Sequence, residues 1–296
     1  MTFGQLRTFL ELSRTGSVRR AAAALFVTEP SVSAAVSALQ KDLGTTLVER
    51  QGRGVRLTAA GQELALHAAV ILGAVDRAQR AVREVGGGAR HLRVAAVTTA
   101  GEYVLAPLLK QFLAGNPGLQ VSLRVGNRVD VINTLLGHEA DLAVAGRPPA
   151  GSEITGQAFL DNPLVVVGAP GHHLDSDHAI DPRVLSRETW LMREPGSGTR
   201  QTTEEFLAAA GIQPASLMTV GSNSATKSAA AVGLGVTLIS ADAVAAELAA
   251  GTLVRLNVKG TPLLRSWFAL TLSSAPLPPS GRAFLDFLLA DAAARG

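Results

Sequence analysis

The sequence predicts an α/β protein in three parts: an all-helical N-terminal unit, one long connecting helix and two α/β lobes. Three observations support this expectation. Between residues 17 and 58, residues that can cap helices precede stretches of small and apolar residues. A heptad repeat of apolar residues then runs to residue 85. From residue 91 onward, apolar strand-like segments alternate with amphipathic helical segments. Such alternation is typical of a parallel, doubly wound sheet.

The composition excludes several classes of protein. No apolar run reaches the ~20 residues that a membrane-spanning helix needs, and the N-terminus lacks the residue order of a signal peptide. Cysteine is absent, which excludes disulfides and thiolate metal sites. We therefore expect a cytoplasmic protein that makes no contact with a membrane.

The charge is distributed unevenly along the chain. Residues 1–90 hold 12 Lys and Arg against 7 Asp and Glu, whereas residues 91–296 hold 15 against 17. The net charge of +3 therefore comes from the N-terminal part. A basic excess there suits the neutralisation of DNA phosphates.

Residues 17–58 predict a DNA-reading unit. Ser17 and Thr28 are expected to cap two successive helices, and Pro30 lies in the first turn of the second, where its missing N–H costs little. One side of that second helix is apolar, and the other carries small uncharged residues that suit the DNA major groove. Gly52 and Gly54 then predict a tight turn flanked by arginines. The residues expected to contact DNA are Arg19, Arg20, Thr28, Pro30, Ser31, Ser33, Ala34, Ser37, Arg50, Arg53 and Arg56.

The stretch GSVRRAAAALFVTEPSVSAAVSALQKDLGTTLVERQGRGVRLTAAG resembles the winged helix-turn-helix of LysR-type transcriptional regulators. The resemblance implies a regulator without a cofactor or enzymatic activity, whose homodimer or homotetramer binds dyad promoter sites in double-stranded DNA. RNA polymerase is a further candidate partner. Many relatives carry Arg or Gln where this chain has Ala34 and Ala35. Base reading is therefore expected to depend more on the helix start, the wing and DNA shape.

A heptad seam follows the wing. Thr58 is placed to cap a helix up to Val85, with arginines off the seam at 77, 80 and 83 that are expected to face solvent. The seam either pairs two subunits or packs onto its own domain, and the resemblance favours pairing. The residues expected to form the dimer contact are Leu64, Ala68, Ile71, Val75, Ala78 and Val82.

The remaining chain predicts two lobes. Strands are expected at 93–97, 119–125, 141–145, 164–168, 190–193, 217–220, 236–239 and 267–272, and helices at 102–114, 129–136, 199–210, 224–232 and 280–292. The resemblance implies a periplasmic-binding-protein-like effector domain over 91–296. Its first lobe is 91–160 plus 266–296, and its second is 161–265. The DNA-binding domain is then 1–58 and the linker 59–88.

Polar segments after several strands predict a cleft for a small anion, because ligands of such sheets bind beyond the carboxyl ends of strands, near helix N-termini. The most specific is the loop 196–200, in which Arg200 can hold a carboxylate or phosphate with two hydrogen bonds. The alternative is an ordinary turn with an outward arginine. The expected effector contacts are Thr98, Thr99, Ala100, Asn127, Arg147, Ser197, Gly198, Thr199, Arg200, Asn223 and Lys227.

The effector region is also similar to the CbbR branch of the LysR-type regulators, which control carbon-fixation genes. The similarity lies in the segments REPGSGTR, GNR, GRPP and SNSATKSAAAVGLGVTLIS. It implies an anionic effector, with sugar phosphates and phosphoglycolate as first candidates and sulfate-like ions next.

Other functions find less support in the sequence. The segment from Gly221 to Ser228 lacks the second glycine of a phosphate-binding loop, and no Gly-x-Ser-x-Gly elbow of a hydrolase is present. His172, His173, Asp175, Asp177 and His178 could ligate a metal, but a solvated loop explains them more simply. A solute-binding or transport protein is the main alternative, because the two lobes alone would suit one. Residues 1–58 argue against it.

Overall fold

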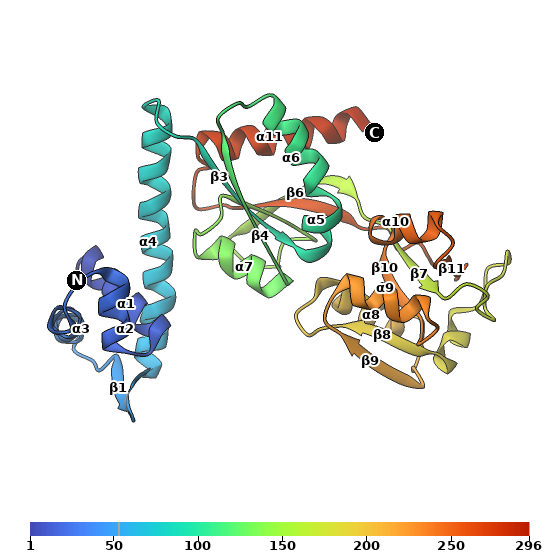
Figure 1. Ribbon diagram of the computed structural model, residues 1–296, viewed down its shortest axis with the longest axis horizontal. Helices are drawn as coiled ribbons and strands as arrows, with labels where there is room; N and C mark the ends of the chain where they lie inside the picture. Colours follow the sequence, from blue (N-terminus) through green and yellow to red (C-terminus); the bar gives the residue numbers. More distant parts are fainter. Residues whose placement is uncertain (53, 296) are drawn as a thin grey trace. The chain divides into compact units, whose positions relative to one another are not determined.

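The computed structural model describes residues 1–52 and 54–295 of the chain (Figure 1). Two compact units are present: residues 1–88 with 136–139, and residues 89–135 with 140–296. Each is described by itself below. No single helix among the described residues is long and apolar enough to cross a membrane. The helices Val18–Leu25 and Glu29–Leu43 together have the length and composition of a span, but the chain bends by 105° between them.

The N-terminal unit is a three-helix core with a β-hairpin wing. It contains α1 (Phe3–Thr15), α2 (Val18–Leu25), α3 (Glu29–Leu43), β1 (Val48–Gln51) and β2 (Gly54–Leu57). The Ser17 and Thr28 hydroxyls accept hydrogen bonds from the N–H groups of Arg20 and Ser31, so both expected caps form. β1 and β2 pair antiparallel from Val48 opposite Leu57 to Gln51 opposite Gly54.

α1 was not expected from the sequence, although local residues specify its start well. Thr2 and Gln5 form a reciprocal capping box, in which each side chain accepts a hydrogen bond from the other's backbone N–H. Leu6 and Phe9 of α1 are buried with Leu39 and Leu47. α1 therefore supplies much of the core against which α3 packs.

The long helix α4 (Ala59–Val85) begins at Thr58, whose hydroxyl accepts the Gly61 N–H at 3.0 Å. Its heptad seam does not form one continuous face. Ala68 is fully buried, and Leu64 and Ile71 pack beside it in the core of the N-terminal unit. Ala78 and Val82 are exposed. The expectation that Arg77 faces solvent is wrong, because this side chain is only 4% exposed.

A different row of α4 faces outward. Leu66, Val70, Ala74, Ala78 and Val82 are all exposed and follow one another at intervals of four residues. Residues four apart are neighbours on a helix, so these side chains form a continuous apolar strip that winds round α4. The strip shares Ala78 and Val82 with the predicted seam and departs from it before them, because the first half of that seam closes the core beneath α4.

The first lobe is a five-stranded sheet in the order β4-β3-β5-β12-β6. Its strands are β3 (His91–Val97), β4 (Gln120–Gly126), β5 (Leu142–Ala145), β6 (Ile154–Asp161) and β12 (Ser266–Leu272). Its helices are α5 (Thr98–Tyr103), α6 (Leu105–Ala114), α7 (Arg128–Leu136) and α11 (Pro279–Arg295). Figure 1 shows α6 and α11 together on one side of the sheet. Phe112 of α6 and Phe284 of α11 pack with their ring centroids 4.9 Å apart and their planes tilted by 56°.

The second lobe holds two smaller sheets, ordered β10-β7-β11 and β8-β9. The strands are β7 (Leu164–Gly168), β8 (Thr189–Arg193), β9 (Ser216–Val220), β10 (Thr237–Ser240) and β11 (Val254–Arg255). The helices are α8 (Gly198–Ala209), α9 (Asn223–Ala231), α10 (Ala241–Ala249) and the 3-10 turn η1 (Pro182–Arg187). Buried apolar side chains of β7 and β10 alternate between two apolar clusters, with Val166 and Leu238 in one and Val165 and Ile239 in the other.

The expectation of a purely parallel sheet is wrong. β3 pairs parallel with β4 and β5, but β12 runs antiparallel to both β5 and β6. The cause is the path of the chain, which leaves the first lobe after β6 and returns to it along β12. The expected single helix over 102–114 is also divided, because α5 starts at Thr98 and a break at Val104 separates it from α6.

Candidate functional site

The face of α3 expected to meet DNA is exposed. Val32, Val36 and Leu39 turn into the core, which leaves the opposite side of the helix to solvent. Thr28, Pro30, Ser31, Ser33, Ala34 and Ser37 are all exposed on α3 or at its start, and Arg19 and Arg20 are exposed on α2. The exposed side chains of α3 itself are small, so the helix can approach the floor of a DNA groove closely.

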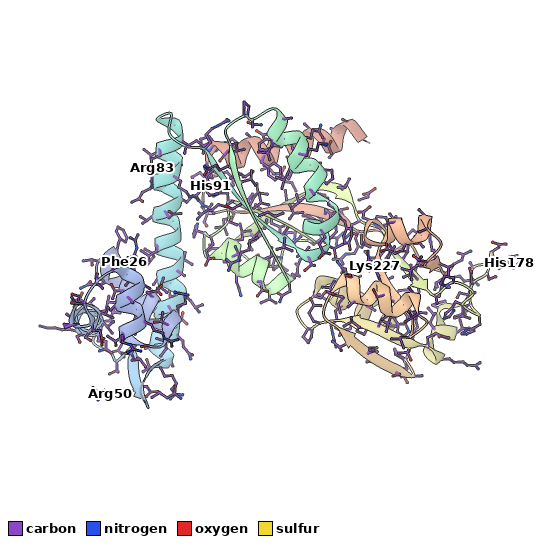
Figure 2. The ribbon with its side chains drawn as sticks, viewed as in Figure 1. Phe26, Arg50, Arg83, His91, His178 and Lys227 are labelled. Carbon is purple, nitrogen blue, oxygen red and sulfur yellow. The ribbon has the colours of Figure 1, made fainter. Side chains whose placement is uncertain are left out.

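The wing presents part of its predicted basic surface. Arg50 and Arg56 are exposed on β1 and β2, and Figure 2 shows Arg50 projecting from the hairpin. Arg56 pairs with Glu49 across the hairpin, so part of its charge is neutralised within the protein. Arg53, the third predicted wing contact, lies outside the described residues.

A small cavity of about 40 Å³ lies between the two lobes. It is bounded by the last residues of three parallel strands, Val97, Gly126 and Arg193, and by Gly146 directly after a fourth. Strands of an open α/β sheet place ligands at this carboxyl edge. The N-termini of α7 and α8 also reach the cavity, through Arg128 and Ser197. Helix N-termini carry unpaired N–H groups and partial positive charge.

Six of the predicted effector contacts line this cavity: Thr98, Thr99, Asn127, Ser197, Gly198 and Thr199. Asn127 also caps α7, since its Oδ1 accepts the Asp130 N–H at 2.9 Å. Thr98 Oγ1 donates to the Gly126 carbonyl at 3.2 Å, which ties the two strand ends together. The six residues come from three segments far apart in the sequence, and the folding of both lobes brings them together.

A buried polar network closes the rear of the cavity. Asn223 is fully buried, and its Nδ2 donates to Thr99 Oγ1 and to Glu102 Oε2, both at 3.1 Å. Its Oδ1 accepts a hydrogen bond from the guanidinium of Arg193. That guanidinium is only 5% exposed and also grips Glu194 with two hydrogen bonds of 2.8 and 2.9 Å. Asn223 therefore supports the cavity wall without itself lining the cavity.

The other predicted contacts are placed elsewhere. Arg200 donates to Glu204 at 2.7 Å and to the Arg193 carbonyl at 2.9 Å, and it does not line the small cavity. Lys227 pairs with Glu247 at 2.6 Å and lies 5.1 Å from the Tyr103 ring centre. Ala100 is buried in the core of the first lobe, and Arg147 lines a neighbouring cavity.

Two other arginines line the small cavity, in the place that the sequence predicted for Arg200. Arg128 begins α7, and Arg265 precedes β12; both line the small cavity. Burial lowers the pKa of both guanidinium groups, and for Arg265 the charges of Arg128 and Arg147 lower it further. Arg265 followed no motif in the sequence. It reaches the cavity because the chain returns to the first lobe at this point.

The histidines weighed as metal ligands in the sequence lie beside a different carboxylate. His172 and His173 both approach Glu188, with Nε2 to carboxylate distances of 3.5 and 3.1 Å. Leu174 N–H donates to His172 Nδ1 at 3.2 Å. The ligand atoms of His172, His173 and Glu188 lie within 4.8 Å of one another, so Glu188 stands in this group where the sequence offered Asp175, Asp177 and His178.

Comparison with known proteins gives a consistent result over the whole chain. Residues 3–62 match the profile described as bacterial regulatory helix-turn-helix protein, lysR family, and residues 86–293 match the LysR substrate binding domain. The chain is 36% identical to the HTH-type transcriptional activator CmpR of Synechocystis, over 98% of this chain and 95% of that protein. It is 37% identical to the transcriptional regulator CbbR of Xanthobacter flavus, over 97% and 87%.

Two solved structures illustrate the two halves of the chain. The regulatory domain of Synechocystis CcmR in complex with 2-PG has a TM-score of 0.63 and 33% identity, and covers 68% of this chain and 96% of that domain. Full-length CbnR in complex with its target DNA has a TM-score of 0.70 over 98% of this chain and all of that one. At 23% identity, the second comparison establishes the fold alone.

Proposed function

The chain belongs to the LysR family of bacterial transcriptional regulators, and we propose that its binding to promoter DNA responds to a small organic anion held in the cavity between its lobes. The observation that supports this most directly is the lining of that cavity. Hydroxyl groups of Thr98, Ser197 and Thr199 meet the guanidinium groups of Arg128 and Arg265 at the N-termini of two helices. Hydroxyls, guanidinium groups and helix N-termini all favour an anion.

The size and polarity of the cavity narrow the ligand class. A volume of about 40 Å³ favours a compact ligand. Glu194 also lines the cavity, but Arg193 holds its carboxylate through two hydrogen bonds. The positive charge of Arg128 and Arg265 is therefore left for the ligand. Because the regulatory domain of CcmR, which is 33% identical, was solved in complex with 2-PG, phosphoglycolate is the first ligand to test.

The residues of the site follow from the same geometry. We assign ligand contact to Thr98, Thr99, Asn127, Ser197, Gly198 and Thr199, joined by Arg128 and Arg265. Arg200, predicted as the main charge contact, is assigned to holding the carbonyl end of β8, since it donates to the Arg193 carbonyl. Lys227 is assigned to joining α9 to Glu247 of α10.

Coupling to DNA requires that the anion bind two arrangements of the protein with different affinity. The lobes are tied together beside the cavity, where the Arg128 N–H donates to the Gly196 carbonyl at 3.2 Å. Arg265 lies where the chain returns to the first lobe, and it donates to Thr202 of the second lobe. An anion that engages Arg128 and Arg265 therefore acts on a contact between the lobes and on the point where the chain crosses between them. Closure of the lobes over the ligand is therefore the source of coupling that we propose.

The domain assignment completes the proposal. Residues 1–58 bind DNA, 59–88 pair two subunits and 91–296 sense the anion. The protein would act in the cytoplasm, where the promoter DNA lies.

An electrophoretic mobility shift with the DNA upstream of the gene and of its neighbours tests the function. We expect a retarded complex whose affinity or mobility changes when phosphoglycolate is added. Arg265→Gln should keep the complex and lose the response, whereas Arg183→Gln, an exposed arginine on η1, should keep both. A response that survives in Arg265→Gln contradicts the site, and no response to any anionic metabolite contradicts the ligand class.

A further inference from the structure

A second, larger cavity lies beside the first. It measures about 600 Å³ and is lined by three arginines, Arg128, Arg147 and Arg265. Arg128 and Arg265 line both cavities, so their side chains lie between them. Arg147 is exposed and lines only the larger one of the two. The two cavities therefore share a wall but differ in their other charged residues, which are Arg193 and Glu194 in the small cavity and Arg147 and Glu205 in the larger one.

The arginines converge around one point. A Cβ atom added to Gly146 would lie 2.9 Å from Arg265 Nη2 and 3.6 Å from Arg128 Nη1. Arg128 also donates a hydrogen bond to the backbone carbonyl of Arg147, which holds the two residues together. The guanidinium groups of Arg128 and Arg265 therefore lie around the same backbone position, where their like charges repel one another unless a negative charge lies nearby.

Carboxylates do not balance this charge. Within residues 1–52 and 54–295, none of the three arginines forms an ion pair with Asp or Glu. Glu205 is the one acidic side chain among the described residues that line the larger cavity, so its lining carries an excess of two positive charges.

The ionisation of the arginines reflects the same imbalance. Burial is the main cause that lowers the pKa of Arg265; Glu205 opposes the shift, while Arg128 and Arg147 add to it. A positive charge in this cavity is therefore disfavoured, and a bound anion would remove the cost.

We propose that the larger cavity is a second anion site, which holds the phosphate group of an organic phosphate. The planar guanidinium fork donates paired hydrogen bonds to phosphate oxygens, and a phosphate with two negative charges matches the excess charge of the lining. Pro148, Pro149 and Leu264 form an apolar side of the cavity, against which the organic part of the ligand packs. Leu264 is 84% exposed and available for such a contact.

Isothermal titration of the full chain with inorganic pyrophosphate tests the site. We expect one equivalent of pyrophosphate to bind in the presence of saturating phosphoglycolate. Arg147→Gln should weaken pyrophosphate binding about tenfold or more, because it removes a charge-assisted partner, and leave phosphoglycolate binding unchanged. Arg255→Gln, an exposed arginine on β11, is the matched control and should change neither. Ser197→Ala should weaken only phosphoglycolate.

Three results would overturn the second site. The first is pyrophosphate binding to Arg147→Gln with the affinity of the unchanged chain. The second is competition between pyrophosphate and phosphoglycolate for one equivalent per chain, and the third is no pyrophosphate binding at all. Arg128 and Arg265 line both cavities, so the two anions share these guanidinium groups, whereas Arg147 lines the larger cavity and not the small one. If phosphoglycolate fails to bind, titration of pyrophosphate alone against Arg147→Gln still decides the question.

Discussion

Asn223 Nδ2 donates a hydrogen bond of 3.1 Å to Thr99 Oγ1, which joins two buried side chains that lie 124 residues apart in the chain. Thr99 belongs to α5 of the first lobe and Asn223 to α9 of the second. Arg193 and Glu102 use the remaining hydrogen-bonding atoms of the same amide. One asparagine therefore links both lobes directly behind the proposed anion site.

Replacing this asparagine should loosen the effector domain. Asn223→Ala leaves Arg193 and Thr99 with buried polar atoms that have lost their partner, which typically costs about 1–3 kcal/mol of the free energy of unfolding. Urea unfolding of the full chain measures the loss. Asn257→Ala is the control, because the exposed Asn257 also donates through its amide, at 2.9 Å to the Asp177 carbonyl. Equal stability of the two variants would contradict a structural role for the lobe link.

The pair Lys227–Glu247 should give stability that depends on pH. Burial lowers the pKa of Lys227, but hydrogen bonds to Glu247 and Tyr103 more than offset it, so the pKa lies above its usual value. Burial raises the pKa of Glu247, and the bond to Lys227 more than reverses this, so its pKa lies below its usual value. A raised lysine pKa gives stability that is lost at high pH, and a lowered carboxyl pKa gives stability that is lost at low pH.

We therefore expect a coupling between Lys227→Met and Glu247→Gln at neutral pH of up to about 1 kcal/mol. It should fade as the pH falls below about 4 or rises above about 10.5, near the ordinary pKa values of the two groups. Double-mutant cycles of thermal unfolding at several pH values measure it. A coupling that stays constant from pH 3 to pH 11 would show that the contact is apolar packing against Tyr103.

The exposed strip on α4 should form the subunit contact. Val82→Asp places a charge on the strip formed by Leu66, Val70, Ala74, Ala78 and Val82. A buried charge without a partner costs about 3–5 kcal/mol, so the dimer should shift toward monomers in sedimentation. Gln79→Asp, on an exposed position beside the strip, should leave the oligomer unchanged.

The predicted seam gives a contrasting result. Ala68→Asp should unfold the N-terminal unit before it affects pairing, because Ala68 is fully buried in the core of that unit. A folded monomer of Ala68→Asp would support the seam predicted from the sequence. An intact dimer of Val82→Asp would contradict both the strip and the seam, because Val82 belongs to both.

DNA binding should depend on the wing and on α3 in different ways. Arg50 is exposed on the wing and suits a phosphate contact. Arg50→Ala should weaken binding to all DNA to a similar extent and lower the salt slope by about one charge. Ser33→Arg on the exposed face of α3 should instead block close approach to the groove and lose specific binding. Fluorescence anisotropy with the operator and with unrelated DNA at several salt concentrations separates the two effects. Identical behaviour of both variants would refute the assignment.

Local features of the sequence determined the N-terminal unit and most helices and strands. Ser17, Thr28 and Thr58 each cap a helix at the predicted place, because a cap depends only on a side chain and the N–H groups two or three residues later. The three-part architecture and the family followed for the same reason, since the motifs are contiguous in the chain.

The tertiary structure alone decided which side chains share a site. Arg200 and Lys227 lie in segments that suit an anion, yet Glu204 and Glu247 engage them. Arg265 lacks any motif and still reaches the cavity, because the chain crosses back between the lobes just before β12. Likewise, the heptad on α4 could not show which of its faces the core of α1 and α3 would cover. Residues distant in sequence decide where a side chain points and whether its charge is paired, and a local sequence pattern does not include those residues.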